Sequence, residues 1–159
     1  MQMHYRWRNP RHPNPPRSEL LKFARAAAAA AGLPADDDWV LEVDFIGDRT
    51  MTRLNDEMLG HIGTTDVITF SYFDDAETFF PGDTGVELYI NADIAAREGA
   101  KRPGGYSREL ALYLVHGLLH SSGEDDLEPS ARRRMRMRER QVLGELEKSF
   151  DFARIFPES

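Results

Sequence analysis

Residues 115–126 read VHGLLHSSGEDD, and this stretch is the most informative part of the sequence. His116 and His120 are four residues apart, so on an α-helix of about 3.6 residues per turn their side chains lie on one face. The leucines and the valine around them predict a buried central helix that carries a polar pair at one edge. Gly123 permits the sharp turn that ends a helix. The chain can then reverse and bring Asp126 back toward the two imidazoles.

Two imidazole nitrogens and one carboxylate oxygen are a typical ligand set of a catalytic zinc site, in which water takes the remaining position. The alternative is that His116 and His120 are ordinary helix histidines and that Asp126 is a helix cap. The glycine and the carboxylate at suitable offsets favour the metal site. We therefore predict one zinc ion per chain, held by His116, His120 and Asp126 at the end of the central helix.

The residue after the first histidine bears on the kind of enzyme. Zinc proteases with an H-E-x-x-H motif place a glutamate general base directly after that histidine. This chain has Gly117 at the same place. A peptidase built on this helix would lack its base, so the sequence argues against peptide hydrolysis.

Outside this motif, the sequence predicts an α+β fold in which a small mixed β-sheet packs with about five helices. Alternating apolar residues predict strands over 39–45, 67–72 and 86–90. Helix formers and end signals predict helices over about 18–31, 92–102, 107–121 and 129–148, and one more that begins at Asp48. Residues 74–84 are expected to form a loop. We expect a single domain over residues 1–159, with a polar, arginine-rich N-terminal segment at 1–17 and an irregular tail at 150–159.

The composition limits the classes of protein that remain possible. The 159 residues suit one domain, and no apolar run approaches the roughly 20 residues that span a bilayer. There is no cysteine, so disulfides and thiolate ligands are excluded, and a cytoplasmic location is the default expectation. The net charge of -7 argues mildly against a nucleic-acid partner. However, residues 131–140 hold six arginines against the single Glu139, and such a run forms either a basic face or an ordinary solvated helix surface.

Two separated motifs resemble those of the YbeY family of bacterial metal-dependent endoribonucleases. The family pattern H-G-x-L-H-x-x-G-x-D-H is similar to residues 116–126, except that Asp126 stands in place of the last histidine. A second pattern, L-N-x-E followed by T-D-V-x-x-F, resembles residues 54–70, and the resemblance covers roughly residues 38–145. The matching residues are His116, Gly117, Leu119, His120, Gly123 and Asp125 in the first motif, and Leu54, Asn55, Glu57, Thr65, Asp66, Val67 and Phe70 in the second.

The resemblance implies an α+β fold, one zinc ion and a single-strand-specific endoribonuclease. It implies action in 3′ end maturation of small-subunit ribosomal RNA and in ribosome quality control. The expected partners are ribosomal RNA and the small ribosomal subunit, with no membrane partner, and the oligomeric state stays open. Two alternatives remain: a non-enzymatic ribosome assembly factor braced by its metal, and a metallohydrolase of another substrate.

One departure from the family pattern concerns catalysis. The family tends to carry an arginine after L-N-x-E, where it would clamp a phosphate, and this chain has Leu59 there. His61, two residues further, is the candidate substitute, and the alternative is a loop histidine without function. We therefore name His116 and His61 as the expected catalytic residues. For Asp66, which either lies near the site or only begins a strand, the structural role is favoured.

Overall fold

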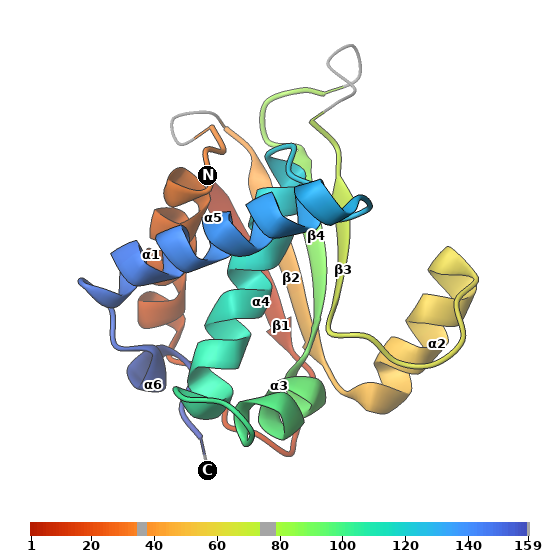
Figure 1. Ribbon diagram of the computed structural model, residues 1–159. Coiled ribbons are helices and arrows are strands. Elements are labelled where there is room, and N and C mark those ends of the chain that lie inside the picture. The colour runs from red at the N-terminus through yellow and green to blue at the C-terminus, as the bar shows by residue number, and fades with distance from the viewer. Residues whose placement is uncertain (35–37, 74–78, 159) are drawn as a thin grey trace.

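The computed structural model describes residues 1–34, 38–73 and 79–158, which form one mixed sheet covered by helices (Figure 1). The strands of this part of the chain are β1 (Gln2–Trp7), β2 (Val40–Ile46), β3 (Val67–Ser71) and β4 (Thr84–Asn91), and they lie in the order β1-β2-β4-β3. β1, β2 and β4 run parallel, and β3 pairs antiparallel with β4. The predicted α+β class with a small mixed sheet is confirmed.

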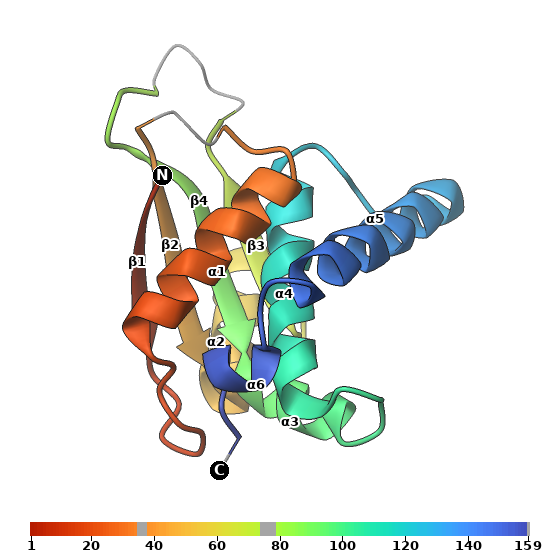
Figure 2. The ribbon, with the colours of Figure 1, turned by 90° about the vertical axis from the view of Figure 1, so that its left-hand side faces the viewer.

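The helices lie mainly on one side of the sheet. α4 packs against β3 and β4 and also contacts α1, α3, α5 and α6. Figure 2 shows α1 and α4 against the same face of the sheet, with α5 crossing the outer side of α4. The helices of the described residues are α1 (Arg17–Ala30), α2 (Asp48–Leu59), α3 (Ala92–Gly99), α4 (Gly105–Ser121), α5 (Pro129–Glu147) and α6 (Phe152–Ile155).

α4 is the central helix, as the sequence predicts. Leu110, Leu114 and Leu118 are fully buried, and a helix that is apolar on most sides belongs in the middle of a core. Its last two turns carry the two histidines of the predicted site. The central helix therefore fixes the site relative to the sheet.

α2 stands apart from this main core, beyond the β3 edge of the sheet (Figure 1). Met51 of this helix packs with Ile46 and Ile68 in a small second core. Met58, seven residues after Met51 on the same helix, is exposed. α2 is therefore held mainly at its beginning, and its end, with Leu59, lies in solvent.

The first correction concerns residues 1–17, which were expected to be only a polar segment. Residues 2–7 form β1, the edge strand that pairs in parallel with β2. Met3 is buried, while Tyr5 and Trp7 pack against the core from the same side of the strand. The alternation of these three residues is the signal of a strand, and the surrounding arginines and prolines hid it.

The second correction concerns the tail at 150–159, which was expected to be irregular. Residues 152–155 form the short helix α6, which begins where the Asp151 side chain accepts a hydrogen bond from the Ala153 amide. Ile155 and Phe156 are buried, and Phe152 and Phe156 contact the ring of Phe23 in α1. The tail thus completes the core, and α6 raises the described helices above the expected number of about five.

The remaining predicted elements agree with the structure to within a few residues, apart from the helix at 92–102, which ends at Gly99. Of the predicted loop at 74–84, residues 74–78 lie outside the described residues, and Thr84 already belongs to β4. Among the helices described, not one combines the length and the apolar character needed to cross a membrane.

Candidate metal centre

The three predicted ligands meet at the end of α4. The rings of His116 and His120 lie edge to face, with their centroids 4.7 Å apart. Asp126 Oδ2 lies 3.5 Å from His120 Nε2 and 3.9 Å from His116 Nε2. One ligand atom from each residue can be chosen so that all three lie within 4.8 Å of one another. This group can therefore bind a metal ion.

The turn after α4 brings Asp126 to the histidines. Gly123 has a φ of +109°, a backbone conformation that side chains of L-residues rarely adopt. The amide of Glu124 donates to the Leu119 carbonyl, which closes the end of the helix. Asp125 Oδ1 accepts from the Leu127 amide, so this carboxylate serves the turn. The neighbouring carboxylate, that of Asp126, is left to face the imidazoles.

A fourth residue, Glu139 of α5, completes the arrangement and was not predicted as part of the site. Its Oε1 lies 2.5 Å from His116 Nδ1, and its side chain is only 13% exposed. A carboxylate accepts, so Nδ1 carries the proton and donates it. Nε2 is then the nitrogen that faces Asp126 and is available to a metal, an arrangement common among metal-binding histidines. The signal was present in the sequence, since Glu139 is the single acid among the arginines of residues 131–140.

Electrostatics at His116 follow from these neighbours. Burial alone would lower the pKa of the His116 imidazole, because it disfavours the charged form. The hydrogen bond and negative charge of Glu139, followed by the charges of Asp66 and Asp126, outweigh burial and raise the pKa above its usual value. The surroundings of Nε2 therefore favour positive charge, either a proton or a metal cation.

Gly117 has a packing role that the sequence alone did not reveal. A Cβ at this position would lie 2.7 Å from Leu88 Cδ2 and 3.3 Å from Thr69 Oγ1. The glycine thus lets α4 approach β3 and β4 closely at the turn that carries His116. It fixes the depth at which the histidine pair sits over the sheet.

A pocket of about 510 Å³ opens beside His116, between the residues before β3 and helices α3, α4 and α5. Asp66 lines it and lies directly before β3. Its side chain accepts from the Val67 amide, and its carbonyl accepts from the Asn91 amide. Asp66 therefore has the structural role that the sequence favoured, and it also lies beside the candidate site. Arg102, the cation of the pocket, pairs with Glu98 and Glu109.

The structure does not bring His61 to the ligand cluster. His61 is exposed in the loop after α2, where its backbone amide donates to the Asn55 carbonyl. Within residues 1–34, 38–73 and 79–158, its side chain makes no hydrogen bond or ion pair and does not line the pocket at His116. Its predicted catalytic role stays a prediction.

The sequence profile of the family described as Endoribonuclease YbeY matches residues 13–147. The chain is 34% identical over 131 residues to an Endoribonuclease YbeY of Chlorobium phaeobacteroides, which covers 82% of this chain and 88% of the relative. It is 30% identical over 115 residues to an Endoribonuclease YbeY of Thermus thermophilus, covering 72% of this chain and 82% of the relative.

A solved structure supports the fold. The solution structure of a protein from Thermotoga maritima superposes with a TM-score of 0.54 at 17% sequence identity, over 92% of this chain and 93% of the other. At that identity the likeness shows the shared fold alone. The profile match over most of the chain and the two relatives carry the assignment further: the chain belongs to the YbeY family of endoribonucleases.

Proposed function

We propose that this protein is a metal-dependent endoribonuclease with one zinc ion held by His116, His120 and Asp126. The convergence of these three donors is the observation that carries the proposal. Ligands about 2.0–2.2 Å from a tetrahedral zinc ion lie roughly 3.4 Å apart. The separations of 3.5 and 3.9 Å from Asp126 Oδ2 to the two Nε2 atoms suit such an ion.

The chemistry divides between the ion and the chain. When bound, zinc supplies positive charge to a phosphate oxygen and lowers the pKa of a water molecule. The chain holds the donors: Glu139 fixes the proton of His116 on Nδ1, and the turn at Gly123 presents Asp126. The pocket beside His116 has room for part of an RNA strand next to the donors.

The substrate we propose is single-stranded RNA near the 3′ end of small-subunit ribosomal RNA, in 3′ end maturation and ribosome quality control in the cytoplasm. Membership of the family supports an RNA substrate. His116 and His61 remain the proposed catalytic residues, with His61 on the loop that leads to Asp66 at the pocket. Leu59 supplies no cation, so we expect slow turnover on naked RNA and faster cleavage on the assembled particle, which positions the strand.

A second candidate function is that of a non-enzymatic assembly factor whose metal braces the fold. Two observations favour it: Leu59 replaces the phosphate-clamping arginine, and Arg102, the cation of the pocket, is already paired with acids. In both candidates the same ligands hold the metal, but only the first needs it for chemistry, so a folded variant that lacks the metal can still serve the second.

Metal analysis and complementation together test the proposal. Purified protein should carry about one zinc ion per chain. His116→Ala and Asp126→Ala should lose it, whereas Asp125→Ala, whose carboxylate serves the turn, and His4→Ala, on the exposed side of β1, should keep it. Full zinc occupancy in both His116→Ala and Asp126→Ala contradicts the site.

The second part follows precursor small-subunit RNA in cells that lack this protein. Wild type and His4→Ala should restore mature 3′ ends, and folded His116→Ala should not. Equal rescue by wild type and His116→Ala would exclude metal-dependent cleavage and favour the assembly factor. Rescue by His61→Ala at the wild-type level would remove His61 from the mechanism.

A further inference from the structure

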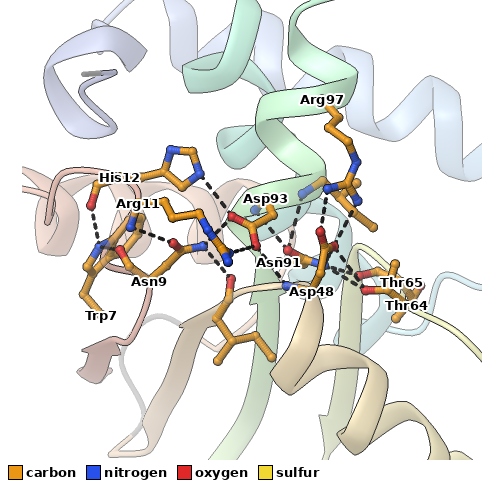
Figure 3. Close-up of polar contacts among 12 residues, drawn as sticks. Trp7, Asn9, Arg11, His12, Asp48, Thr64, Thr65, Asn91, Asp93 and Arg97 are labelled. Carbon is orange, nitrogen blue, oxygen red and sulfur yellow. Dashed lines mark hydrogen bonds and ion pairs between the residues drawn. The ribbon is translucent and has the colours of Figure 1, made fainter.

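Figure 3 shows a second cluster of charged side chains, gathered around Asp48 and Asp93. This cluster lies at the other end of α4 from the candidate metal centre. His12 of the loop after β1 stacks on Tyr106 in the first turn of α4, with ring centroids 4.9 Å apart. His116 follows Tyr106 by ten residues, which is about 15 Å along a helix. The cluster is therefore separate from the metal centre.

Asp93, in the first turn of α3, is the buried centre of this cluster. Its Oδ1 accepts from Asn9 Nδ2 at 3.0 Å and contacts His12 Nε2 at 3.3 Å. Its Oδ2 accepts from Arg11 Nη1 at 2.8 Å and from the backbone amide of Asp48 at 3.0 Å. A carboxylate offers about four lone-pair sites, so these four partners occupy all of them.

Asp48, the first residue of α2, is similarly occupied. Arg97 of α3 donates to its Oδ2 at 2.5 Å and to its Oδ1 at 2.9 Å. Asn91 Nδ2 donates to Oδ1 at 2.9 Å, while Asn91 Oδ1 caps α3. Figure 3 shows the two carboxylates side by side, with the guanidinium groups of Arg11 and Arg97 reaching them from different segments.

Over these carboxylates lies an open pocket of about 370 Å³, whose charged walls are Arg11, Arg49, Arg97, Asp48 and Asp93. Three guanidinium groups face two carboxylates, which leaves one positive charge in excess. Arg11 uses one of its terminal nitrogens, and Arg49 makes no hydrogen bond or ion pair within the described parts of the chain. N–H groups of Arg11 and Arg49 therefore remain available as hydrogen-bond donors, while the carboxylate oxygens of Asp48 and Asp93 already accept hydrogen bonds. A ligand that fits must bring negative charge and several acceptor oxygens.

We propose that this pocket, lined by Arg11, Arg49 and Arg97, binds a phosphate group. A phosphate presents three or more oxygens, enough to accept from guanidinium groups that belong to three separate segments, and arginine forks match its geometry. The phosphate can come from the backbone of an RNA strand or from a free oligophosphate such as pyrophosphate. The site depends neither on the metal nor on cleavage.

Arg49 is the residue to test, because it is exposed and its removal breaks no bond of the network. Arg53 lies one turn later on α2, is also exposed, and lies outside the pocket, so Arg53→Ala is the matched control for charge. All titrations use the His116→Ala background, where a phosphate cannot be captured by a metal at the other site. Two probes are used. The first is pyrophosphate, whose binding is measured by calorimetry and by shifts of the His12 ring resonances in NMR spectra. The second is a short single-stranded RNA.

Pyrophosphate should bind the His116→Ala protein and its Arg53→Ala derivative equally and shift the His12 resonances. Arg49→Ala should weaken binding about tenfold, the loss expected for one charge-assisted contact. If pyrophosphate does not bind but Arg49→Ala weakens RNA binding more than Arg53→Ala does, the phosphate belongs to an RNA strand and the site stands. Equal effects of the two variants on both probes, or no binding of either probe, overturn the site. The proposed cleavage stands apart, because it is tested by His116→Ala against wild type.

Discussion

At the scale of single residues, the contact between His116 and Glu139 orients one ligand of the candidate metal centre. Glu139 lies on α5 and His116 on α4, so the hydrogen bond between them joins two helices at the site. Because Nδ1 is held in its protonated form, the lone pair of Nε2 is directed to the position between the ligands before any ion arrives. Outer partners of this kind orient a ligand and increase its basicity.

Glu139→Ala should lower the affinity for zinc by roughly 10- to 100-fold, since mutation of such partners has effects of that size. Glu139→Gln should lose less, because its amide oxygen still accepts from Nδ1 although the negative charge is gone. Competition with a chelator of known affinity measures the change. Glu145→Ala, an exposed acid on the same helix, is the control and should bind zinc like the wild type. An affinity unchanged in Glu139→Ala would show that the contact does not prepare the ligand.

At the scale of elements, the close approach of α4 to the sheet sets the position of both histidines. Gly117 faces Leu88 of β4 and Thr69 of β3, and it leaves no room for a side chain there. Gly144 in α5 is also a helical glycine, but a Cβ at that position would meet nothing within 4 Å. The two glycines therefore allow packing to be separated from helix propensity.

Gly117→Ala should lower the free energy of unfolding by about 1 kcal/mol, because the 1–3 kcal/mol cost of overpacking exceeds the roughly 1 kcal/mol that alanine gains in a helix. Gly144→Ala should instead raise it by about 0.5–1 kcal/mol. Urea denaturation of the two variants measures both changes. If Gly117→Ala raised the free energy of unfolding as much as Gly144→Ala, the sheet would accommodate the added methyl group with no loss of stability.

A second junction between elements is Asp93, which ties the loop after β1 to the first turns of α2 and α3. Burial alone would raise the pKa of this carboxyl, but the hydrogen bonds from Asn9 and the Asp48 amide, with the charge of Arg11, outweigh burial and lower it. A carboxyl with a lowered pKa in the folded state stabilises the protein above its unfolded pKa of about 3.9. That contribution is lost as the pH falls below this value toward the folded pKa.

Asp93→Asn should therefore unfold more easily than the wild type at neutral pH, by roughly 1.5 kcal/mol, the lower end for hydrogen bonds to a charged group, because Arg11 is itself exposed. The difference should shrink as the pH is lowered below about 4. Chemical denaturation at a series of pH values measures it, with Asp56→Asn, an exposed acid of α2, as the control. A difference that is independent of pH would assign the effect to packing and not to charge.

The sequence predicted the elements whose signals are local. The predicted α4 rests on a long apolar pattern, and the ligand set rests on a four-residue spacing and one glycine, all within residues 107–126. β1 was missed because its six residues, in which apolar and polar side chains alternate, lie among arginines and prolines. Their pairing with β2 identifies them as a strand. Glu139 was missed because the partner of His116 depends on how α5 crosses α4, and helix crossing is a tertiary property.

At the scale of the whole molecule, charge is unevenly distributed over the surface. The net charge is -7, yet α5 presents exposed arginines, among them Arg132 and Arg136 one turn apart. Arg138 is partly buried and donates to the Ala30 carbonyl, so it belongs to the packing of α5 on α1. The exposed arginines of α5 thus form a basic surface on the helix that also carries Glu139.

Charge reversal of both Arg132 and Arg136 to glutamate should weaken RNA binding and flatten its dependence on salt. Loss of two phosphate contacts lowers the slope of log K against log salt by about 1.4 for a single strand. Titration of a labelled RNA at several salt concentrations measures the slope. Reversal of Lys22 and Arg25, which are exposed on α1, is the control. Equal slopes for wild type and the α5 variant would assign these arginines to solvent.

The position of the metal centre within the chain also has a consequence for biosynthesis. The three ligands and the outer partner all come from residues 116–139, whereas the sheet joins residues 2–7 to 40–46 and to 84–91. Chains emerge from the ribosome with the N-terminus first, so the strands are available before α5 exists. The donor set together with its outer partner therefore exists only once residue 139 has been added to the chain. A chain cut short before Glu139 therefore holds all three donors but lacks the carboxylate that orients His116.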